Sequence, residues 1–379
     1  MEDVVLFKYL SIYYLLPIFL IITACGSEEE MKENESNTSD QQTNDSSQPE
    51  TSPESFSVET VATELNVPWA IQSHDDHFYV TERNGTIARI DENGTVHRQN
   101  VESTEEIVSN GEGGLLGFIL DPNFSESQKA YLYHSYQQNN SILNRIIAVT
   151  KQGESWIEEK ILLDNIPGSQ IHNGGRLKIG PDGFLYATTG DANMEDKSQQ
   201  TDNFAGSILR MTLDGSVPDD NPIDNSYVYS YGHRNPQGLD WNEDNQLYSS
   251  EHGSSAHDEI NHIQPGENYG WPVITGDEEQ NDMETPLLHS GSDTWAPSGS
   301  TFDSNNNFYV TGLRGTQLMR IDMEEETMEV VFSGEGRLRD VFIRDDDMYV
   351  ITNNRDGRGN PDENDDQLLK LSHFENHSE

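Results

Sequence analysis

The chain has 379 residues, 33% of them hydrophobic, and combines 68 acidic with 22 basic residues for a net charge of −46. This charge argues against nucleic acid as a partner, because phosphate binding depends on clustered lysine and arginine. The length suffices for one large all-β domain or for two domains of ordinary size.

Residues 1–25 are expected to form a signal peptide. They contain the apolar run "LFKYLSIYYLLPIFLIITAC", which ends at Cys25, the only cysteine. The last four residues resemble a lipobox, the site at which bacteria cleave a leader and acylate the new N-terminal cysteine. An uncleaved membrane anchor and an ordinary secretory signal are the alternatives. We expect lipid on Cys25 to hold the protein in the cell envelope, on the outer face of the bacterial membrane.

Residues 26–55 are rich in Ser, Glu and Asn and almost lack apolar side chains. Such a segment cannot bury enough surface to offset the entropy of ordering, so it is expected to be a disordered, flexible tether. Residues 373–379 are expected to be a frayed tail. The folded domain is therefore predicted over residues 56–372.

Residues 56–372 repeat one short pattern: a polar turn, a strand-like segment with a tyrosine, and then polar loop residues. Most repeats are about 50 to 60 residues apart, and most are followed by a second short strand. Short strands with Gly, Asn and Asp turns at this period predict an all-β, six-bladed β-propeller. A pair of β-sandwiches is the alternative, but it would not explain six matching units. The six tyrosines are Tyr79, Tyr133, Tyr186, Tyr248, Tyr309 and Tyr349.

In a propeller, the loops after equivalent strands converge on one face around the central channel. Asp191, the Glu251–Gly253 segment and the Leu313–Arg314 segment each follow a repeated strand. We expect them to meet there despite their separation in sequence, and to line a ligand pocket.

The segment "IHNGGRLKIGPDGFLYATTGD", residues 171–191, places His172 among glycines just before a predicted strand. Glycine allows positive φ and close approach, and polar side chains on a loop held by a rigid strand often form a site. A solvated or hydrogen-bonded loop histidine is the alternative interpretation.

Six segments together resemble the soluble quinoprotein sugar dehydrogenases. This family comprises aldose sugar and soluble glucose dehydrogenases that use pyrroloquinoline quinone (PQQ) and calcium on a six-bladed propeller. The resemblance covers nearly all of residues 60–372, and "GHRNPQG" with "DEIN…PGENYGWP" is its most specific part. The segments are "GEGGLLGFILDPNF", "IHNGGRLKIGPDG", "YGHRNPQGLDW", "SSEHGSSAHDEINHIQPGENYGWP", "APSGSTF" and "EGRLRDVFI".

The resemblance implies oxidation of an aldose at C1 to a lactone, with electrons passing to an external acceptor. His172 matches the general base that removes the hydroxyl proton while hydride passes to the quinone, a task suited to histidine. Asp191 matches the carboxylate that orients this histidine; a turn acceptor is the alternative.

The resemblance also implies how the anionic cofactor is held. Arg234 and Asn235 match residues that bind the quinone, and Arg337 and Arg339 match a pair on its far side. Arginine suits this role because its planar guanidinium pairs with carboxylate in a bidentate manner. Two solvent-facing arginines are the alternative for the pair.

Two calcium sites are implied. Gly253 and Ser254 match two backbone carbonyls that bind the calcium ion lying on the cofactor, where the family often has proline at the second position. Glu259 and Tyr269 match a second, structural calcium site. Oxygen ligands suit calcium, and the first ion would polarise the quinone as a Lewis acid. A buried carboxylate and a core tyrosine are the alternative for the second pair.

Three positions depart from the family pattern. Glu112 stands where soluble glucose dehydrogenases have a cofactor-binding glutamine, and a carboxylate there would repel an anionic quinone unless it were protonated or bridged. Arg314 replaces a cofactor-binding lysine, which keeps the charge but changes the geometry. Trp295 is the tryptophan nearest to the position, around Ser292, of an aromatic residue that covers the cofactor.

Other functions remain open at this point. One is a calcium-stabilised propeller that binds sugars or glycans without catalysis, and another is a calcium-dependent lactonase, which would have no quinone carboxylates for the arginines to bind. A zinc hydrolase is a third, because His and carboxylate residues cluster locally, but their spacing lacks the i, i+4 geometry of zincins. That cluster comprises His252, His257, Asp258, Glu259 and His262.

Overall fold

The computed structural model describes residues 56–345 and 347–373. Within them the all-β prediction is confirmed: 24 strands are accompanied by one helical turn, α1 (Phe124–Ser127), and one 3-10 segment, η1 (Glu195–Gln199). Neither has the length and apolar character that a membrane-crossing helix needs. The predicted signal peptide with Cys25, the predicted tether and residues 374–379 of the predicted tail lie outside the described residues.

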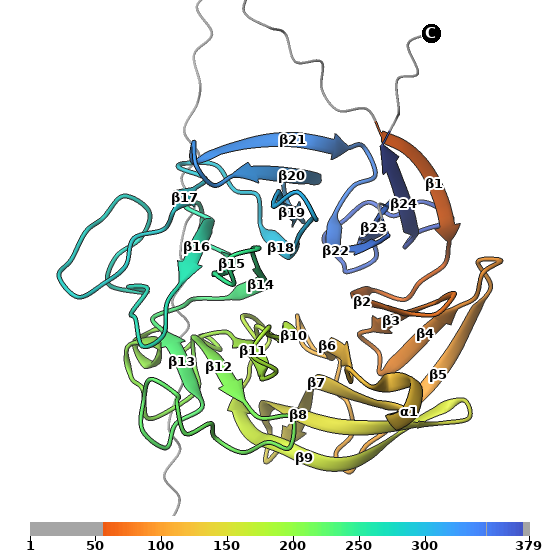
Figure 1. Cartoon of the computed structure of the whole chain (residues 1–379), viewed down its shortest axis with the longest axis horizontal. Coiled ribbons are helices and arrows are strands. Elements are labelled where there is room, and N and C mark those ends of the chain that lie inside the picture. Colours follow the sequence, from red (N-terminus) through yellow and green to blue (C-terminus); the bar gives the residue numbers. More distant parts are fainter. Residues whose placement is uncertain (1–55, 346, 374–379) are drawn as a thin grey trace, which may run out of the picture. The chain divides into compact units, whose positions relative to one another are not determined.

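Four sheets contain four strands each, and the sheets lie around a common centre as a β-propeller (Figure 1). The first joins the N-terminal strand to the C-terminal ones, since Val58 in β1 pairs with Leu371 in β24. In sequence order the strands of these sheets are β1 (Phe56–Ala62), β22 (Leu338–Arg344), β23 (Asp347–Thr352) and β24 (Leu368–His373); β10 (Leu177–Ile179), β11 (Leu185–Thr189), β12 (Ser207–Met211) and β13 (Val228–Tyr231); β14 (Pro236–Trp241), β15 (Leu247–Glu251), β16 (Glu259–Ile263) and β17 (Leu288–His289); and β18 (Pro297–Phe302), β19 (Phe308–Gly312), β20 (Gln317–Asp322) and β21 (Thr327–Ser333).

The fifth sheet has eight strands in the order β2-β3-β4-β5-β9-β8-β7-β6. Its two antiparallel halves are joined by a short parallel pairing in which Asn100 of β5 lies opposite Ser155 of β9. The strands are β2 (Pro68–His74), β3 (His77–Glu82), β4 (Thr86–Ile90), β5 (Val96–Glu102), β6 (Leu115–Leu120), β7 (Lys129–Gln138), β8 (Ser141–Gln152) and β9 (Ser155–Pro167).

The six tyrosine segments form equivalent strands: β3, β7, β11, β15, β19 and β23. Each pairs antiparallel with the strand that follows it, as the repeat predicted. In five of the six, the tyrosine lies opposite a basic residue, as Tyr79 does with Arg89 and Tyr349 with Lys370. The repeat therefore encodes a cross-strand pair as well as a turn.

Apolar side chains fill the spaces between neighbouring sheets. The largest cluster centres on Trp156, whose ring lies 5.4 Å from that of Phe118 in an edge-to-face contact. The indole N–H donates to Gln99 Oε1 at 2.9 Å, so its polar end is satisfied. This packing fixes the inner strands, which in turn hold the loops at their ends in place.

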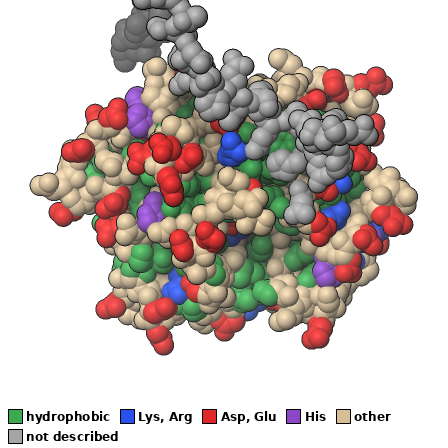
Figure 2. Space-filling view, turned by 45° about the horizontal axis from the view of Figure 1, so that its top comes forward, with side chains coloured by type: hydrophobic (Ala, Val, Ile, Leu, Met, Phe, Trp, Pro, Cys, Tyr) green, Lys and Arg blue, Asp and Glu red, His purple; other side chains and the backbone are tan. Residues whose placement is uncertain are grey.

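Charge is distributed unevenly between surface and interior. Acidic side chains are spread over the face seen in Figure 2, and few lysines or arginines appear on it. Six arginines are nevertheless buried: Arg83, Arg145, Arg176, Arg210, Arg337 and Arg339. A buried cation requires a partner of opposite charge or good hydrogen-bond acceptors. A buried arginine without a carboxylate partner therefore indicates a place for an anionic ligand.

Candidate active site

His172 and Asp191 form a hydrogen-bonded couple in the loops beside β10 and β11. His172 lies in the loop before β10 with φ +55°, and its Nδ1 is 2.8 Å from Asp191 Oδ1. The fully buried Asp191 also accepts from Asn193 N at 2.7 Å and, through Oδ2, from Trp271 Nε1 at 2.9 Å. With Asp191 as the acceptor, the hydrogen of neutral His172 resides on Nδ1 and Nε2 carries the free lone pair.

The backbone of His172 is held as firmly as its ring. Its N–H donates to Glu112 Oε2 at 3.0 Å, and its carbonyl accepts from Ala192 N at 3.1 Å. Gly190 makes this approach possible, because a Cβ there would lie 2.0 Å from the His172 carbonyl oxygen. The loop is therefore built around one orientation of the histidine.

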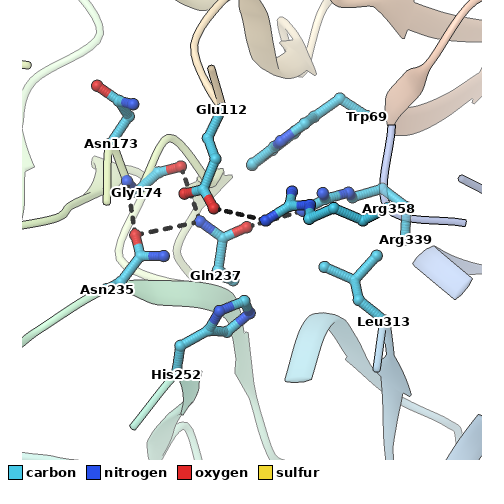
Figure 3. A pocket seen from close by; sticks show the side chains of 10 residues that line it. All are labelled: Trp69, Glu112, Asn173, Gly174, Asn235, Gln237, His252, Leu313, Arg339 and Arg358. Atoms are coloured by element: carbon cyan, nitrogen blue, oxygen red, sulfur yellow. Dashed lines mark hydrogen bonds and ion pairs between the residues drawn. The ribbon is translucent and has the colours of Figure 1, made fainter. Parts of the chain in front are cut away.

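A narrow cavity lies near this couple at the centre of the propeller (Figure 3). Its walls come from β2, β14 and β22 and from loops that precede or follow five other strands. The lining residues are Trp69, Glu112, Asn173, Gly174, Asn235, Gln237, His252, Leu313, Arg339 and Arg358.

Arg339 projects into this cavity from β22. Its guanidinium bonds Gln237 Oε1 at 2.9 Å, Ser298 Oγ at 3.2 Å and Asn353 Oδ1 at 3.3 Å. All three partners are neutral, and Nε is buried without a partner. Burial lowers the pKa of Arg339 to about 9. Among the described residues, no carboxylate lies within hydrogen-bonding distance of the Arg339 guanidinium to compensate its charge.

Arg234 and Arg337 do not line the cavity, but each donates to the carbonyl of a residue that does. Arg234 donates through one terminal nitrogen to the His252 and Gly253 carbonyls, and Arg337 pairs with Asp356 at 2.9 Å. In both side chains Nε is buried and unpartnered, and burial lowers both pKa values.

His252 adds a fourth unpartnered nitrogen, Nε2. Burial lowers the pKa of His252 to about 4, so the ring is neutral at pH 7. Native proteins leave few buried polar groups unpaired, and each one calls for an explanation. Arg339 and His252, which line the cavity, each have such a nitrogen, and Arg234 and Arg337 have one next to residues of its lining. This arrangement favours an anionic ligand with several acceptor oxygens.

The family model described as Glucose / Sorbosone dehydrogenase matches residues 65–369. The chain belongs to the glucose/sorbosone dehydrogenase family.

Curated relatives in this family agree with the match. Quinoprotein glucose dehydrogenase B from Acinetobacter calcoaceticus is 34% identical over 259 residues, which cover 59% of this chain but only 54% of that protein. Aldose sugar dehydrogenase from Escherichia coli is 27% identical over 357 residues, covering 84% of this chain and 94% of that one.

Solved structures of family members share the fold. The PQQ-bound aldose sugar dehydrogenase from Streptomyces coelicolor has a TM-score of 0.78 at 36% identity and covers 84% of this chain and 99% of its own. A glucose dehydrogenase-like oxidoreductase from Thermus thermophilus gives a TM-score of 0.77, also at 36% identity, over 84% of this chain and 100% of its own.

The structure brings three of the six sequence-predicted cofactor residues together in the cavity. Glu112, Asn235 and Arg339 line the cavity. Arg234 donates to the carbonyl of His252, which also lines it. Asn235 Oδ1 accepts from Gly174 N at 3.0 Å, which ties the histidine loop to β14. Arg337 precedes β22 and turns toward Asp356, so it stands beside the cavity wall and not in it.

Arg314 is placed differently from the other predicted cofactor residues. Its side chain is exposed and does not line the cavity, while the adjacent Leu313 does. The Arg314 backbone N–H donates to Trp295 O at 3.1 Å. Its predicted contact with a cofactor stays a prediction.

The predicted calcium ligands fall into two groups. Gly253 follows β15, its N–H donates to Asp258 Oδ1 at 2.9 Å, and its carbonyl accepts from Arg234; Ser254 is exposed. Because Arg234 occupies the Gly253 carbonyl, a calcium ion there would require this guanidinium to turn away. That carbonyl is therefore accessible to a cation only when Arg234 has another partner.

Glu259 is half-buried and lies opposite a second carboxylate, Glu251, in the pairing of β15 with β16. Burial, and after it the charge of Glu251, raises the pKa of Glu259 to about 8. Such a pair suits a cation, because a shared positive charge would remove the repulsion. The Tyr269 hydroxyl donates to His262 O at 2.6 Å and accepts from Gln264 N at 2.8 Å, so it is engaged within its own loop.

The residues suggested as zinc ligands contact different parts of the protein and do not face one common point. Asp258 Oδ2 accepts from Trp295 N and Ala296 N, and the ring of His262 stacks on Tyr248 at 5.0 Å. Within the described part of the chain, no three His, Cys, Asp or Glu side chains converge as a metal site. The zinc alternative therefore loses its structural basis.

Five cavity residues were not singled out from the sequence: Trp69, Asn173, Gly174, Gln237 and Arg358. Trp69 comes from the inner strand β2, and Arg176 packs over its ring with CZ 4.2 Å from the centroid. Trp295, by contrast, belongs to the core between sheets. Arg358 could have been found, because it lies on a polar loop after the repeated strand β23; Gln237, beside Arg339, was visible within "GHRNPQG".

Proposed function

We propose that this chain oxidises the C1 hydroxyl of aldose sugars to lactones, using PQQ and calcium, and passes the electrons to an external acceptor. One observation carries the proposal: Arg339 is a buried guanidinium without a carboxylate partner in a cavity that adjoins the His172–Asp191 couple. Membership of the family and the names of its relatives support the same chemistry.

The residues present fit PQQ, a planar cofactor with three carboxylates and two adjacent carbonyls. Arg339 would bind one carboxylate, and Trp69 lines the same cavity. Arg337 and Arg234 have unpartnered nitrogens and contact residues of its lining. Arg314 would need to turn inward to take part. Charge-assisted hydrogen bonds of this kind are about twice as strong as neutral ones.

Proton removal falls to His172. Because Nδ1 is committed to Asp191, Nε2 is the atom that takes the hydroxyl proton. Asp191 stabilises the imidazolium that results, and Trp271 and Asn193 keep this carboxylate in place. When bound, PQQ supplies the quinone carbonyl that accepts the hydride from C1.

Calcium would act at two places in this proposal. The Gly253 and Ser254 carbonyls would hold one ion next to the cofactor once Arg234 has turned to the cofactor carboxylates. Glu259, with the carbonyl oxygen of Tyr269, would hold a structural ion beside Glu251. The raised pKa of Glu259 supports the second site, because a bound cation would remove the cost of burying two neighbouring carboxylates.

We also infer six blades. The four four-stranded sheets account for sixteen strands, and the parallel β5–β9 contact divides the eight-stranded sheet into two antiparallel sets of four. The six tyrosine strands support this division, since each set contains one of them.

Attachment through lipid on Cys25 is proposed from the sequence alone. Labelled fatty acid should be incorporated into the wild-type chain and not into a Cys25→Ala variant. Equal labelling of the two proteins would exclude this anchor.

Reconstitution tests the function. The purified protein is incubated with PQQ and calcium, and dye reduction is followed with a panel of aldoses. We expect reduction that depends on PQQ, calcium and sugar together. Sugar binding without PQQ binding at high micromolar concentration would instead establish a binding protein, and lactone hydrolysis without PQQ would establish a lactonase.

A further inference from the structure

The side chain of Arg358, on the loop between β23 and β24, reaches across the cavity mouth to Glu112 (Figure 3). One terminal nitrogen lies 2.8 Å from Glu112 Oε1, and the other lies 3.1 Å from Asp356 Oδ2. The second oxygen of Glu112 accepts the backbone N–H of His172 at 3.0 Å. A single carboxylate thus connects an arginine on one loop to the catalytic loop on another.

These contacts extend into a chain of alternating charge. Arg337 pairs with Asp356, Asp356 with Arg358, and Arg358 with Glu112. Two arginines and two carboxylates leave no net charge. Removal of Arg358 alone would leave one negative charge beside the unpartnered arginine nitrogens.

Glu112 is ionised at neutral pH. Burial opposes ionisation, but His252, Arg358 and the His172 N–H outweigh it and lower the pKa of Glu112 to about 2. Arg358, with a terminal nitrogen 2.8 Å from Glu112 Oε1, is the cation that faces this carboxylate. An unpaired carboxylate here would repel an anionic ligand in the same cavity.

We propose that Arg358 neutralises Glu112, so that Glu112 can position the His172 loop without repelling the anionic cofactor. The inference rests on the proposed function. It assigns Arg358 to cofactor binding, because Arg358 cancels the charge of Glu112. It assigns Glu112 to positioning the His172 loop, a role that a carboxylate can fill here only when Arg358 is present. Arg358 is half-exposed, so its ion pair with Glu112 should contribute little to the free energy of unfolding. Its expected effect is on the affinity for the cofactor.

A double-mutant cycle tests the compensation without turnover. PQQ affinity is measured by calorimetry in calcium buffer for wild type, Arg358→Gln, Glu112→Gln and the double variant. We expect Arg358→Gln to weaken binding about tenfold or more, which is about 1.4 kcal/mol. Glu112→Gln alone should leave affinity within about threefold, and in the Arg358→Gln background it should restore most of the loss.

A matched control is the exposed Arg320–Glu329 pair between β20 and β21, 2.7 Å apart. Arg320→Gln should leave PQQ affinity unchanged. If Arg358→Gln weakens binding equally with Glu112 and with Gln at position 112, the compensation is refuted while the proposed function stands. If wild type itself does not bind PQQ, the proposed function fails and takes this inference with it.

The positioning role has its own measurement. Gln at position 112 can still accept the His172 N–H through its amide oxygen, whereas Glu112→Ala cannot. We expect Glu112→Ala to lower kcat about tenfold or more below that of Glu112→Gln, with the KM for sugar and the thermal midpoint little changed. Equal kcat values for the two variants would overturn the positioning role.

Discussion

Two buried arginines, Arg145 and Arg339, show opposite solutions to the same problem. Arg145 in β8 donates to His134 Nε2 at 3.0 Å, to Thr104 Oγ1 at 3.2 Å and to Glu158 Oε2 at 2.9 Å, so each guanidinium nitrogen has a partner. Arg339 has only neutral partners and an orphan Nε. A buried charge that the protein satisfies by itself is structural, and one that it leaves unsatisfied marks a place for a ligand.

The largest expected effect is on stability, and it separates these two side chains. Arg145→Met should destabilise the protein by about 3–5 kcal/mol, because Glu158 would remain buried without its cation. Arg339→Met should cost about 1 kcal/mol or less in the absence of cofactor. Urea unfolding of the two variants without PQQ measures both values, and equal losses would break the comparison.

Acid should weaken the Arg145 cluster next. Burial, with a further contribution from Arg145, lowers the pKa of His134 to about 4. Between about pH 6.5 and 4 the unfolded chain binds this proton and the folded one does not, so stability falls as the pH falls through this window, by up to about 3 kcal/mol. His134→Gln should remove this part of the acid slope. The difference between the two unfolding curves isolates His134, since His252 is common to both.

Substitution of His172 should affect turnover and leave stability nearly unchanged, which is the reverse of the effect expected for Arg145. His172→Gln should lower turnover about a hundredfold or more, as expected for the loss of a general base. PQQ affinity and the thermal midpoint should change little, because the amide N–H of Gln can replace the Nδ1–H donor to Asp191. Steady-state kinetics alongside thermal melts provide the measurement; unchanged turnover would remove His172 from the mechanism.

The smallest effect concerns Glu259, whose ionisation is opposed by burial and by the neighbouring Glu251. With calcium at about thirtyfold its dissociation constant, binding to the folded state alone should add about 2 kcal/mol. EDTA should reverse this gain and abolish sugar oxidation. Glu259→Gln should remove the calcium-dependent rise in the melting temperature, and a rise of equal size in this variant would locate the ion elsewhere.

The repeat and the motifs predicted much of this molecule. The tyrosine segments placed the equivalent strands, and the "HNGGRL", "TTGD", "GHRNPQG" and "RLR" segments supplied His172, Asp191, Asn235 and Arg339 of the site. Such residues are visible because strand ends and glycine loops are local features. The proposed calcium ligands and Arg314 are equally visible as sequence positions, but whether they bind depends on contacts that local patterns do not encode.

The sequence by itself determined the all-β architecture, since turn residues and alternating strands act over a few positions. Tertiary structure alone decided which charges are paired. Glu112 looked like a liability for an anionic cofactor, yet Arg358, 246 residues further along the chain, neutralises it. Likewise Trp69 lines the cavity, whereas Trp295 packs in a hydrophobic cluster. Such contacts arise where strands and loops of different sheets converge, and sequence separation carries no information about that convergence.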